Sequence, residues 1–232
     1  MRISMSETFE FMKRNRWNLL LVAILLTSLA INLNVSLTEP LVFGDEGFYA
    51  ARGQGIAQSL SIDNLGMGMY GEDKIPGNEH SKKTPMTFLS LSSFYMIAGK
   101  MGMRAFMPIV SILSAFLLFL LTRKLYSTKA GIFATVFYLA APALITHTIF
   151  LYTEQLSLMF LIASVYFLYN YLEREEWLYL TMAGLMFGFS ALTEPTALAF
   201  SVVFAAVLYL YKKGITPWIK ELGTIAVLTL VL

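Results

Sequence analysis

Long apolar runs separated by short polar connections cover most of the chain. The first run extends over residues 17–37, and the others over 105–121, 130–146, 154–171, 177–192, 195–211 and 217–232. Each run approaches the ~20 residues with which an α-helix crosses a bilayer. The first is too long for a signal-peptide core and has no small-residue cleavage site, so we expect it to be retained. The pattern predicts an all-α membrane protein, a bundle of about seven transmembrane helices.

The composition restricts the classes of function. Of 232 residues, 57% are hydrophobic and 14% are charged, which leaves no room for a separate globular catalytic domain beside the spans. The 17 basic and 15 acidic residues give a net charge of +2, too balanced for nucleic-acid binding. The chain has no cysteine, which excludes disulfides and thiolate metal sites. We therefore treat 1–232 as one transmembrane domain, and we expect it to be truncated at the C-terminus because its last apolar run reaches Leu232 without a polar anchor.

Basic residues collect at alternate ends of the apolar runs. They precede the first run, separate the second from the third, follow the fourth, and separate the sixth from the seventh. Lys and Arg near span ends accumulate on the cytoplasmic side. We therefore predict a multi-pass protein of the cell membrane with a cytoplasmic N-terminus. The long connection 38–104 then lies outside, where long loops escape the charge rule.

This outer loop holds 7 of the 15 acidic residues. Its segment 44–57 has helical spacing and predicts an amphipathic helix at the outer membrane surface. The expected apolar face carries Phe48, Ala51 and Ile56, and the expected polar face carries Asp45, Tyr49 and Arg52.

Two readings of Asp45 and Glu46 are open. Acids in a first helical turn complement the positive end of the helix dipole. Alternatively, they form a carboxylate pair at the lipid–water boundary, where partial desolvation raises a carboxyl pKa toward the range of a general base.

A second short helix is predicted after the sequence Lys82-Lys83-Thr84-Pro85. The apolar stretch 86–98 is too short for a span, and Pro85 suits the first turn of an interfacial helix. Two lysines at a helix start oppose its dipole. Either a bound phosphate or anionic lipid headgroups can offset that cost.

Other polar residues of the outer side have weaker signals. Glu79 and His80 offer oxygen and nitrogen ligands for a divalent metal, or form a solvated loop pair. Glu154 is a functional carboxylate, or it lies on the dipole of a helix capped by Thr153. Glu194 is open to similar readings, and His147 is expected to be packed or interfacial. Asn32 and Asn34, in the first run, are predicted to make hydrogen bonds between helices.

Together these features resemble the GT-C integral-membrane glycosyltransferases, in the group of protein O-mannosyltransferases and lipid A aminoarabinose transferases. The resemblance rests on the first-loop Asp45-Glu46 pair, the Lys83-Thr84-Pro85 element and the second outer carboxylate. It implies that Asp45 is the catalytic base or acceptor-positioning carboxylate, with Glu46 beside it. Lys83, or its neighbour Lys82, would bind the donor phosphate, where the family has Lys-Pro-Pro or His-Pro-Pro. Glu154 falls on the family's second acidic position, and no family role is carried onto Glu194.

The resemblance implies an inverting transfer of a sugar from a polyprenyl-phosphate donor to a hydroxyl of a lipid or protein acceptor at the outer membrane face. Tyr49 and Arg52 would help to position the substrate. The sequence shows no required cofactor, and a divalent metal remains possible at Glu79 and His80. The expected partners are the donor, the acceptor and membrane lipids. A non-enzymatic transporter or a scaffold fragment is the alternative; transporters place ionisable groups near mid-membrane, whereas the acids here cluster outside.

Overall fold

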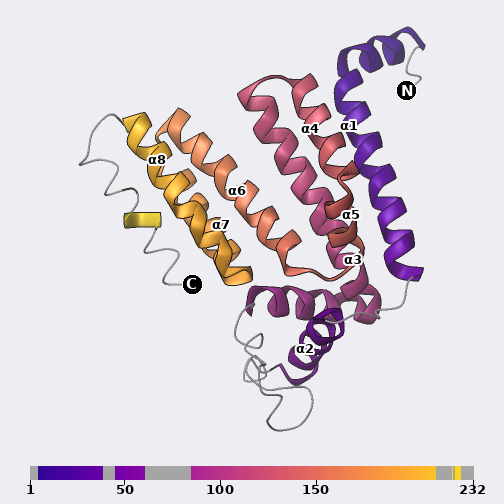
Figure 1. The fold of residues 1–232 in the computed structure, drawn as a ribbon. Coiled ribbons are helices and arrows are strands. Elements are labelled where there is room, and N and C mark those ends of the chain that lie inside the picture. The colour runs from indigo at the N-terminus through magenta and orange to yellow at the C-terminus, as the bar shows by residue number, and fades with distance from the viewer. Residues whose placement is uncertain (1–4, 39–44, 61–84, 213–220, 222, 226–232) are drawn as a thin grey trace.

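The structure is a computed structural model, and it describes residues 5–38, 45–60, 85–212, 221 and 223–225. Helices form all the regular secondary structure of this part of the chain, which confirms the all-α prediction (Figure 1). The elements are α1 (Met5–Thr38), α2 (Asp45–Ser59), α3 (Pro85–Leu125), α4 (Thr128–Ala140), α5 (Pro142–Ile149), α6 (Thr153–Arg174), α7 (Trp177–Thr193), η3 (Pro195–Phe200) and α8 (Ser201–Lys212).

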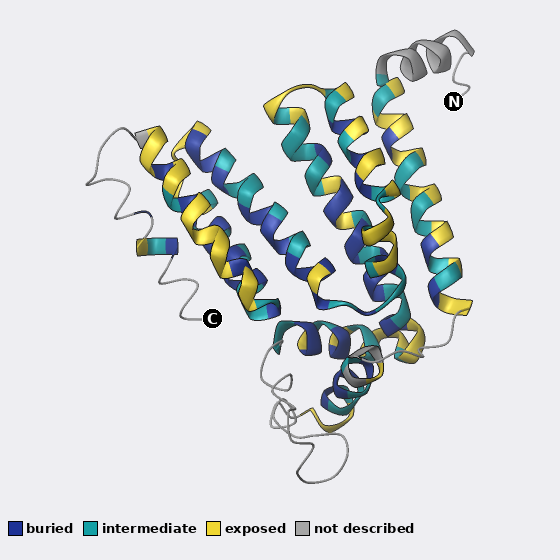
Figure 2. Cartoon of the chain, in the orientation of Figure 1, coloured by how far each residue is buried: buried dark blue, intermediate teal, exposed yellow. Residues whose placement is uncertain are grey.

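The helices have the length and apolar character of membrane spans. Residues 15–38 of α1, together with α3 and α6, are each long and apolar enough to cross a bilayer, and α4 and α5 together form a fourth candidate. The apolar helix α7 and the segment 195–211 are shorter. Large apolar side chains such as Phe137 and Leu210 are exposed, and Figure 2 shows exposed positions along most of α8, as expected where lipid replaces water. Six predicted runs thus coincide with described helices, and the run 217–232 lies almost wholly outside the described residues.

The third predicted run is not one straight helix. It breaks between α4 and α5, whose axes differ by 64°. Pro142 begins α5, and Ala141 before it is extended (φ −67°, ψ 121°). The predicted span over 130–146 is therefore bent at its middle, because a proline removes a backbone donor and disfavours the helical conformation of the residue before it.

A sharp break inside α3 divides it into a short first helix and a longer second one. Ala98 (φ −141°, ψ 21°) and Gly99 (φ 59°, ψ −143°) leave helical geometry. Only glycine adopts the Gly99 conformation without strain. After the break, a Cβ on Gly102 would lie 2.1 Å from the carbonyl oxygen of Phe94, so the two halves meet closely. The prediction of a separate short helix over 86–98 is confirmed.

Small and hydroxyl-bearing residues join α6 to α7. Ser157 and Ser190 lie 2.9 Å apart through their hydroxyl oxygens, and Ser164 donates a hydrogen bond to the carbonyl of Ala183 at 2.7 Å. Such residues let membrane helices approach closely and satisfy their hydroxyls between helices. These contacts hold the pair in register beside a core that includes Leu180 and Phe187.

The end of α1 is attached to α3. The Ser36 hydroxyl donates to the carbonyl of Arg104 at 2.7 Å, and the Arg104 guanidinium donates to the carbonyl of Leu37 at 3.0 Å. The predicted interhelical role of Asn32 and Asn34 was wrong. Asn32 donates to Ser28 one turn earlier in α1, and Asn34 is exposed, because the face of α1 that meets α3 near this end carries Ser36.

Candidate functional site

Four chain segments that carry the candidate residues meet at one end of the bundle. These are α2, the beginnings of α3 and α6, and the end of α7, and we call this the α2 end (Figure 1). One hydrophobic cluster joins the first three, with Ala50 of α2, Leu91 of α3 and Leu156 of α6 among its buried members. Segments separated by some forty to a hundred residues are thus held against a single core.

The helix α2 lies on the first half of α3 and runs in the same direction. The Tyr49 ring is 5.8 Å from that of Phe88, and Gly53 faces Leu91 so closely that a Cβ would lie 2.7 Å from the Leu91 Cβ. Further along, Gln58 donates to the Tyr95 hydroxyl at 3.3 Å. The contacts advance together along both helices, so their first residues lie at the same end of the pair.

Arg52 lies between these two helices, and the predicted polar face of α2 was therefore wrong. Arg52 is only 3% exposed, and its guanidinium carbon is 5.7 Å from the centre of the Phe88 ring. Ile56, one turn later, is buried on the same stripe. Helical spacing placed Arg52 with the polar residues, but a long side chain can bury its stem and stack its planar head on an aromatic ring. Desolvation lowers the pKa of Arg52, whose guanidinium still stays charged at neutral pH.

The parallel packing has a consequence for the first-loop acids. Asp45 is the first residue of α2, one turn before Tyr49, and Pro85 is the first residue of α3, about one turn before Phe88. The contact between Tyr49 and Phe88 is thus made about one turn into each helix. The side chains of Asp45 and Glu46 are not described, and Lys82, Lys83, Glu79 and His80 lie outside the described residues.

Glu154 lies in the first turn of α6, next to a second carboxylate. Its side chain is 56% exposed, and its Oε2 is 4.0 Å from His147 Nδ1. The Thr153 hydroxyl is 3.4 Å from Oε2 of Glu154 and equally far from Oε2 of Glu194 at the end of α7. The structure thus places two carboxylates beside one hydroxyl, and an imidazole beside one of those carboxylates.

Thr153 does not cap α6, so the capping part of that reading was wrong, whereas Glu154 does lie in the first turn of the helix. The N-cap is Tyr152, without a side-chain hydrogen bond, and Thr153 is already helical. Its hydroxyl turns toward the end of α7 instead, where Thr193 and Glu194 end a helix. His147 is packed as expected, with its ring 4.9 Å from that of Tyr152.

The sequence analysis did not predict that Glu194 lies close to Glu154. The available signal was the repeated dipeptide Thr-Glu, at 153–154 and 193–194, which stands at two helix ends on the same side of the membrane. It also missed Gln155, which is buried and donates to the Tyr138 hydroxyl of α4. This hydrogen bond ties α6 to α4 directly behind Glu154.

A metal site receives no support from the residues that the structure describes. No group of three His, Asp or Glu side chains in that part of the chain could hold an ion. The candidate ligands Glu79 and His80 fall in the segment 61–84, whose placement is not described.

Comparison with known proteins gives one result. Residues 82–232, more than half of the chain, match the family described as dolichyl-phosphate-mannose-protein mannosyltransferase. No curated protein and no solved structure matches the chain significantly. The matched range contains Lys82, Lys83, Glu154 and Glu194, and it begins after α2.

Proposed function

Because the chain belongs to the dolichyl-phosphate-mannose-protein mannosyltransferase family, we propose that it transfers a sugar from a polyprenyl-phosphate donor to an acceptor hydroxyl at the outer membrane face. Membership of this family supports a glycosyltransferase of the mannosyltransferase type, and mannose is the sugar in the family's description. The acceptor is a protein or a lipid.

The observation that carries this proposal is the parallel packing of α2 on the first half of α3. We infer from it that Asp45 and Glu46, at the start of α2, act together with Lys82 and Lys83, which precede α3 in the sequence. A carboxylate and a cation are the two charges that this reaction needs. The acceptor oxygen must lose a proton, and the leaving phosphate must be stabilised as it gains charge.

In the proposed reaction, the acceptor oxygen attacks the anomeric carbon from the face opposite the phosphate. The new glycosidic C–O bond forms as the bond from that carbon to the phosphate oxygen breaks, which inverts the anomeric configuration. The hydroxyl proton passes to Asp45, and the electron pair of the broken bond leaves with the polyprenyl phosphate. Lys83, with Lys82 beside it, stabilises that phosphate as a point charge.

The other candidate residues take supporting roles. Arg52 and Tyr49 fix α2 against Phe88 and so position Asp45. Glu154 lies at the same end of the bundle and is exposed enough to contact an acceptor. The carboxylate of Glu194, which shares Thr153 with Glu154, adds negative charge on that side and favours an acceptor with positive or hydrogen-bond-donating groups.

The experiment is sugar transfer by the purified chain in proteoliposomes. A labelled polyprenyl-phosphate mannose is supplied with hydroxyl acceptors, and the product is isolated. Asp45→Asn keeps the size of the side chain and removes its basicity, so transfer is expected to fall about 100-fold or more. Glu46→Gln removes the neighbouring carboxylate and is expected to have a smaller effect.

Each outcome separates the candidate functions. Normal turnover by Asp45→Asn would return Asp45 to a dipole-complementing role. Movement of the donor across the membrane without a transferred sugar would favour a non-enzymatic carrier. If the chain neither transfers the sugar nor binds the donor, a scaffold function would be favoured.

A further inference from the structure

Two cations from different helices flank Trp17 at the opposite end of the bundle. We call this the Trp17 end; it carries the early part of α1 and the connection between α3 and α4 (Figure 1). The Arg16 guanidinium carbon is 5.2 Å from the centre of the indole, and Lys129 Nζ, from the first turn of α4, is 5.8 Å from it. Arg16 and Lys129 are both exposed, and Trp17 packs against the core of Leu21, Phe119 and Ile132.

Among the side chains that the structure describes, neither Arg16 nor Lys129 takes part in an ion pair. The ion pairs found there join Lys124 to Glu173 and His147 to Glu154. The first turn of α4 has no acidic residue, so Lys129 lies at the positive end of a helix dipole, where a cation is destabilising. Arg16 and Lys129 both lie over the Trp17 indole, and the positive end of the α4 dipole is beside them. Together these positive charges favour binding of an anion at the membrane surface.

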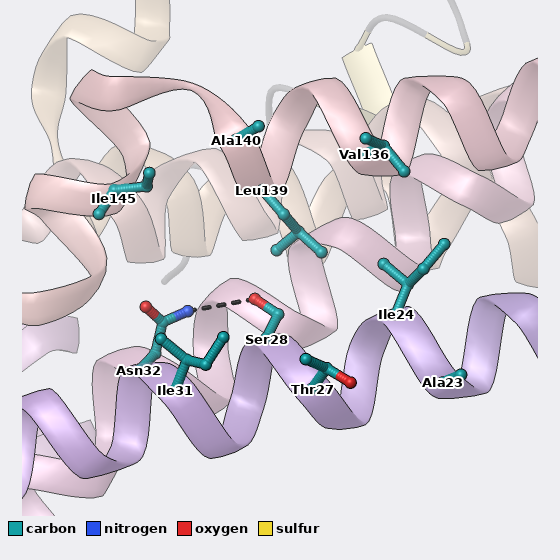
Figure 3. A pocket seen from close by; sticks show the side chains of 10 residues that line it. All are labelled: Ala23, Ile24, Thr27, Ser28, Ile31, Asn32, Val136, Leu139, Ala140 and Ile145. Atoms are coloured by element: carbon teal, nitrogen blue, oxygen red, sulfur yellow. Dashed lines mark hydrogen bonds between the residues drawn. The ribbon is translucent and has the colours of Figure 1, made fainter.

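A groove begins about two helical turns farther along α1 and α4. It has a volume of about 550 Å³ and lies between α1 and the α4–α5 pair. Figure 3 shows Ile24 and Ile31 of α1 on one wall and Val136 and Leu139 of α4 on the other. Thr27, Ser28 and Asn32 add a short polar stripe, and Asn32 is already bonded to Ser28.

The cation pair and the groove share the same helix faces. On α1, Trp17, Ile24 and Ile31 are seven residues apart, which is close to two helical turns. On α4, Lys129 and Val136 have the same spacing. A long molecule that contacts the two cations can therefore reach the apolar groove about two turns farther along the same helix faces.

We propose that this surface binds an anionic phospholipid, with its phosphate on Arg16 and Lys129 and an acyl chain in the groove between α1 and α4–α5. The charges suit an anionic headgroup, since each basic residue near the surface strengthens attraction to anionic lipid. The groove suits an acyl chain, because its lining is largely apolar and it opens laterally toward the bilayer.

This site is distinct from that of the donor phosphate. It lies at the Trp17 end, whereas Pro85 and Glu154 lie at the α2 end (Figure 1). With the proposed orientation, the phospholipid belongs to the cytoplasmic leaflet and the donor to the outer one. The inference does not depend on the proposed reaction, and loss of sugar transfer would leave it standing.

The test uses Trp17 as a local reporter. The chain has tryptophans at 17, 177 and 218, so a Trp177→Phe/Trp218→Phe background leaves Trp17 alone. The protein is placed in nanodiscs with phosphatidylglycerol or phosphatidylcholine that is brominated on the acyl chains, and quenching of Trp17 is titrated. We expect phosphatidylglycerol to quench at about 10- to 30-fold lower mole fraction.

Three variants separate the headgroup from the chain. Arg16→Gln/Lys129→Gln should abolish the preference for phosphatidylglycerol. Arg123→Gln, an exposed arginine at the same end, is the matched control and should keep it. Ala23→Phe/Ala140→Phe fills the groove without changing charge and should weaken quenching by both lipids.

Four results would overturn the proposal. They are equal quenching by the two lipids in the parent background, loss of the preference in Arg123→Gln, unchanged quenching in the groove-filled variant, and competition by millimolar inorganic phosphate. The last would identify a site for free anions. Lys129→Arg keeps the charge and must retain the preference, which separates loss of charge from misfolding.

Discussion

Lys83 is a point charge two residues before the start of α3, and at the residue scale it is the proposed contact for the donor phosphate. A charge-assisted hydrogen bond at a partly dehydrated interface contributes about 1.5 to 3 kcal/mol. Lys83→Ala is therefore expected to weaken donor binding about 10- to 100-fold, and Lys82→Ala less. Binding of polyprenyl-phosphate sugar is measured in nanodiscs.

The control ligand for this prediction is the free polyprenol, which has the same tail and no phosphate. Its affinity should be the same in both variants and in the unmodified protein. If the phosphate and alcohol forms lose affinity equally, the lysines contact headgroups and the phosphate site lies elsewhere.

The sequence identified candidate residues better than it predicted which way their side chains face. The Asp-Glu and Lys-x-Pro motifs gave candidates from sequence alone, because charged residues stand out in a chain that consists mostly of long apolar runs. Arg52 was assigned to the wrong face, because a periodicity pattern counts arginine as polar and ignores its apolar stem. In the structure its head lies on Phe88 and its stem follows the same stripe as Ile56.

At the scale of elements, Gly53 sets the distance between α2 and α3. Its missing Cβ would lie 2.7 Å from the Leu91 Cβ and 3.3 Å from the Ser92 nitrogen. Gly53→Ala should therefore push the helices apart and destabilise their packing by roughly 1 to 3 kcal/mol. Hydrogen exchange of α2 amides should become faster, and sugar transfer should fall with it.

Gly55 supplies the matched control for this prediction. It lies two residues later in the same helix, and nothing lies within 4 Å of the Cβ that alanine would add. Gly55→Ala should be neutral or slightly stabilising, since alanine is the better helix former. If the two variants exchange alike, the close approach at Gly53 does not hold α2 in place.

Helix positions followed from the sequence because long apolar runs have few alternatives in a bilayer. The break at Gly99 was also predictable. The apolar stretch after Pro85 is too short for a span, and together with the following run it is too long for a single one. The bend at Pro142 was not, because the apolar pattern continues through it without a polar residue.

At the scale of the whole molecule, the proposed orientation places the α2 end outside. The natural chain has no cysteine, so single cysteines report sidedness directly. A cysteine at Ser61, next to the end of α2, should react with an impermeant maleimide in intact cells. Tyr126→Cys, in the exposed connection between α3 and α4, should react only after the membrane is opened. The reverse labelling pattern would invert the topology.

The relative placement of helices was the part that sequence could not supply. Neither the packing of α2 on α3 nor the proximity of Glu154 and Glu194 follows from periodicity. Periodicity predicts which face of a helix is buried, and it does not predict which other helix packs on that face. Such pairings depend on side-chain shape across segments far apart in the chain. The approach of Gly53 to Leu91 and the shared Thr153 hydroxyl are both of this kind.

The joint between the two halves of α3 links the candidate site to bilayer thickness. Phe94 of the interfacial half contacts Phe106 of the spanning half edge to face, with ring centres 4.9 Å apart, and its carbonyl rests against Gly102. A spanning helix responds to a thinner or thicker bilayer by changing its tilt. Since the joint is packed on both sides, we expect such a tilt to be carried into the first half of α3 and into α2. The rate of sugar transfer should then depend on the acyl-chain length of the host membrane.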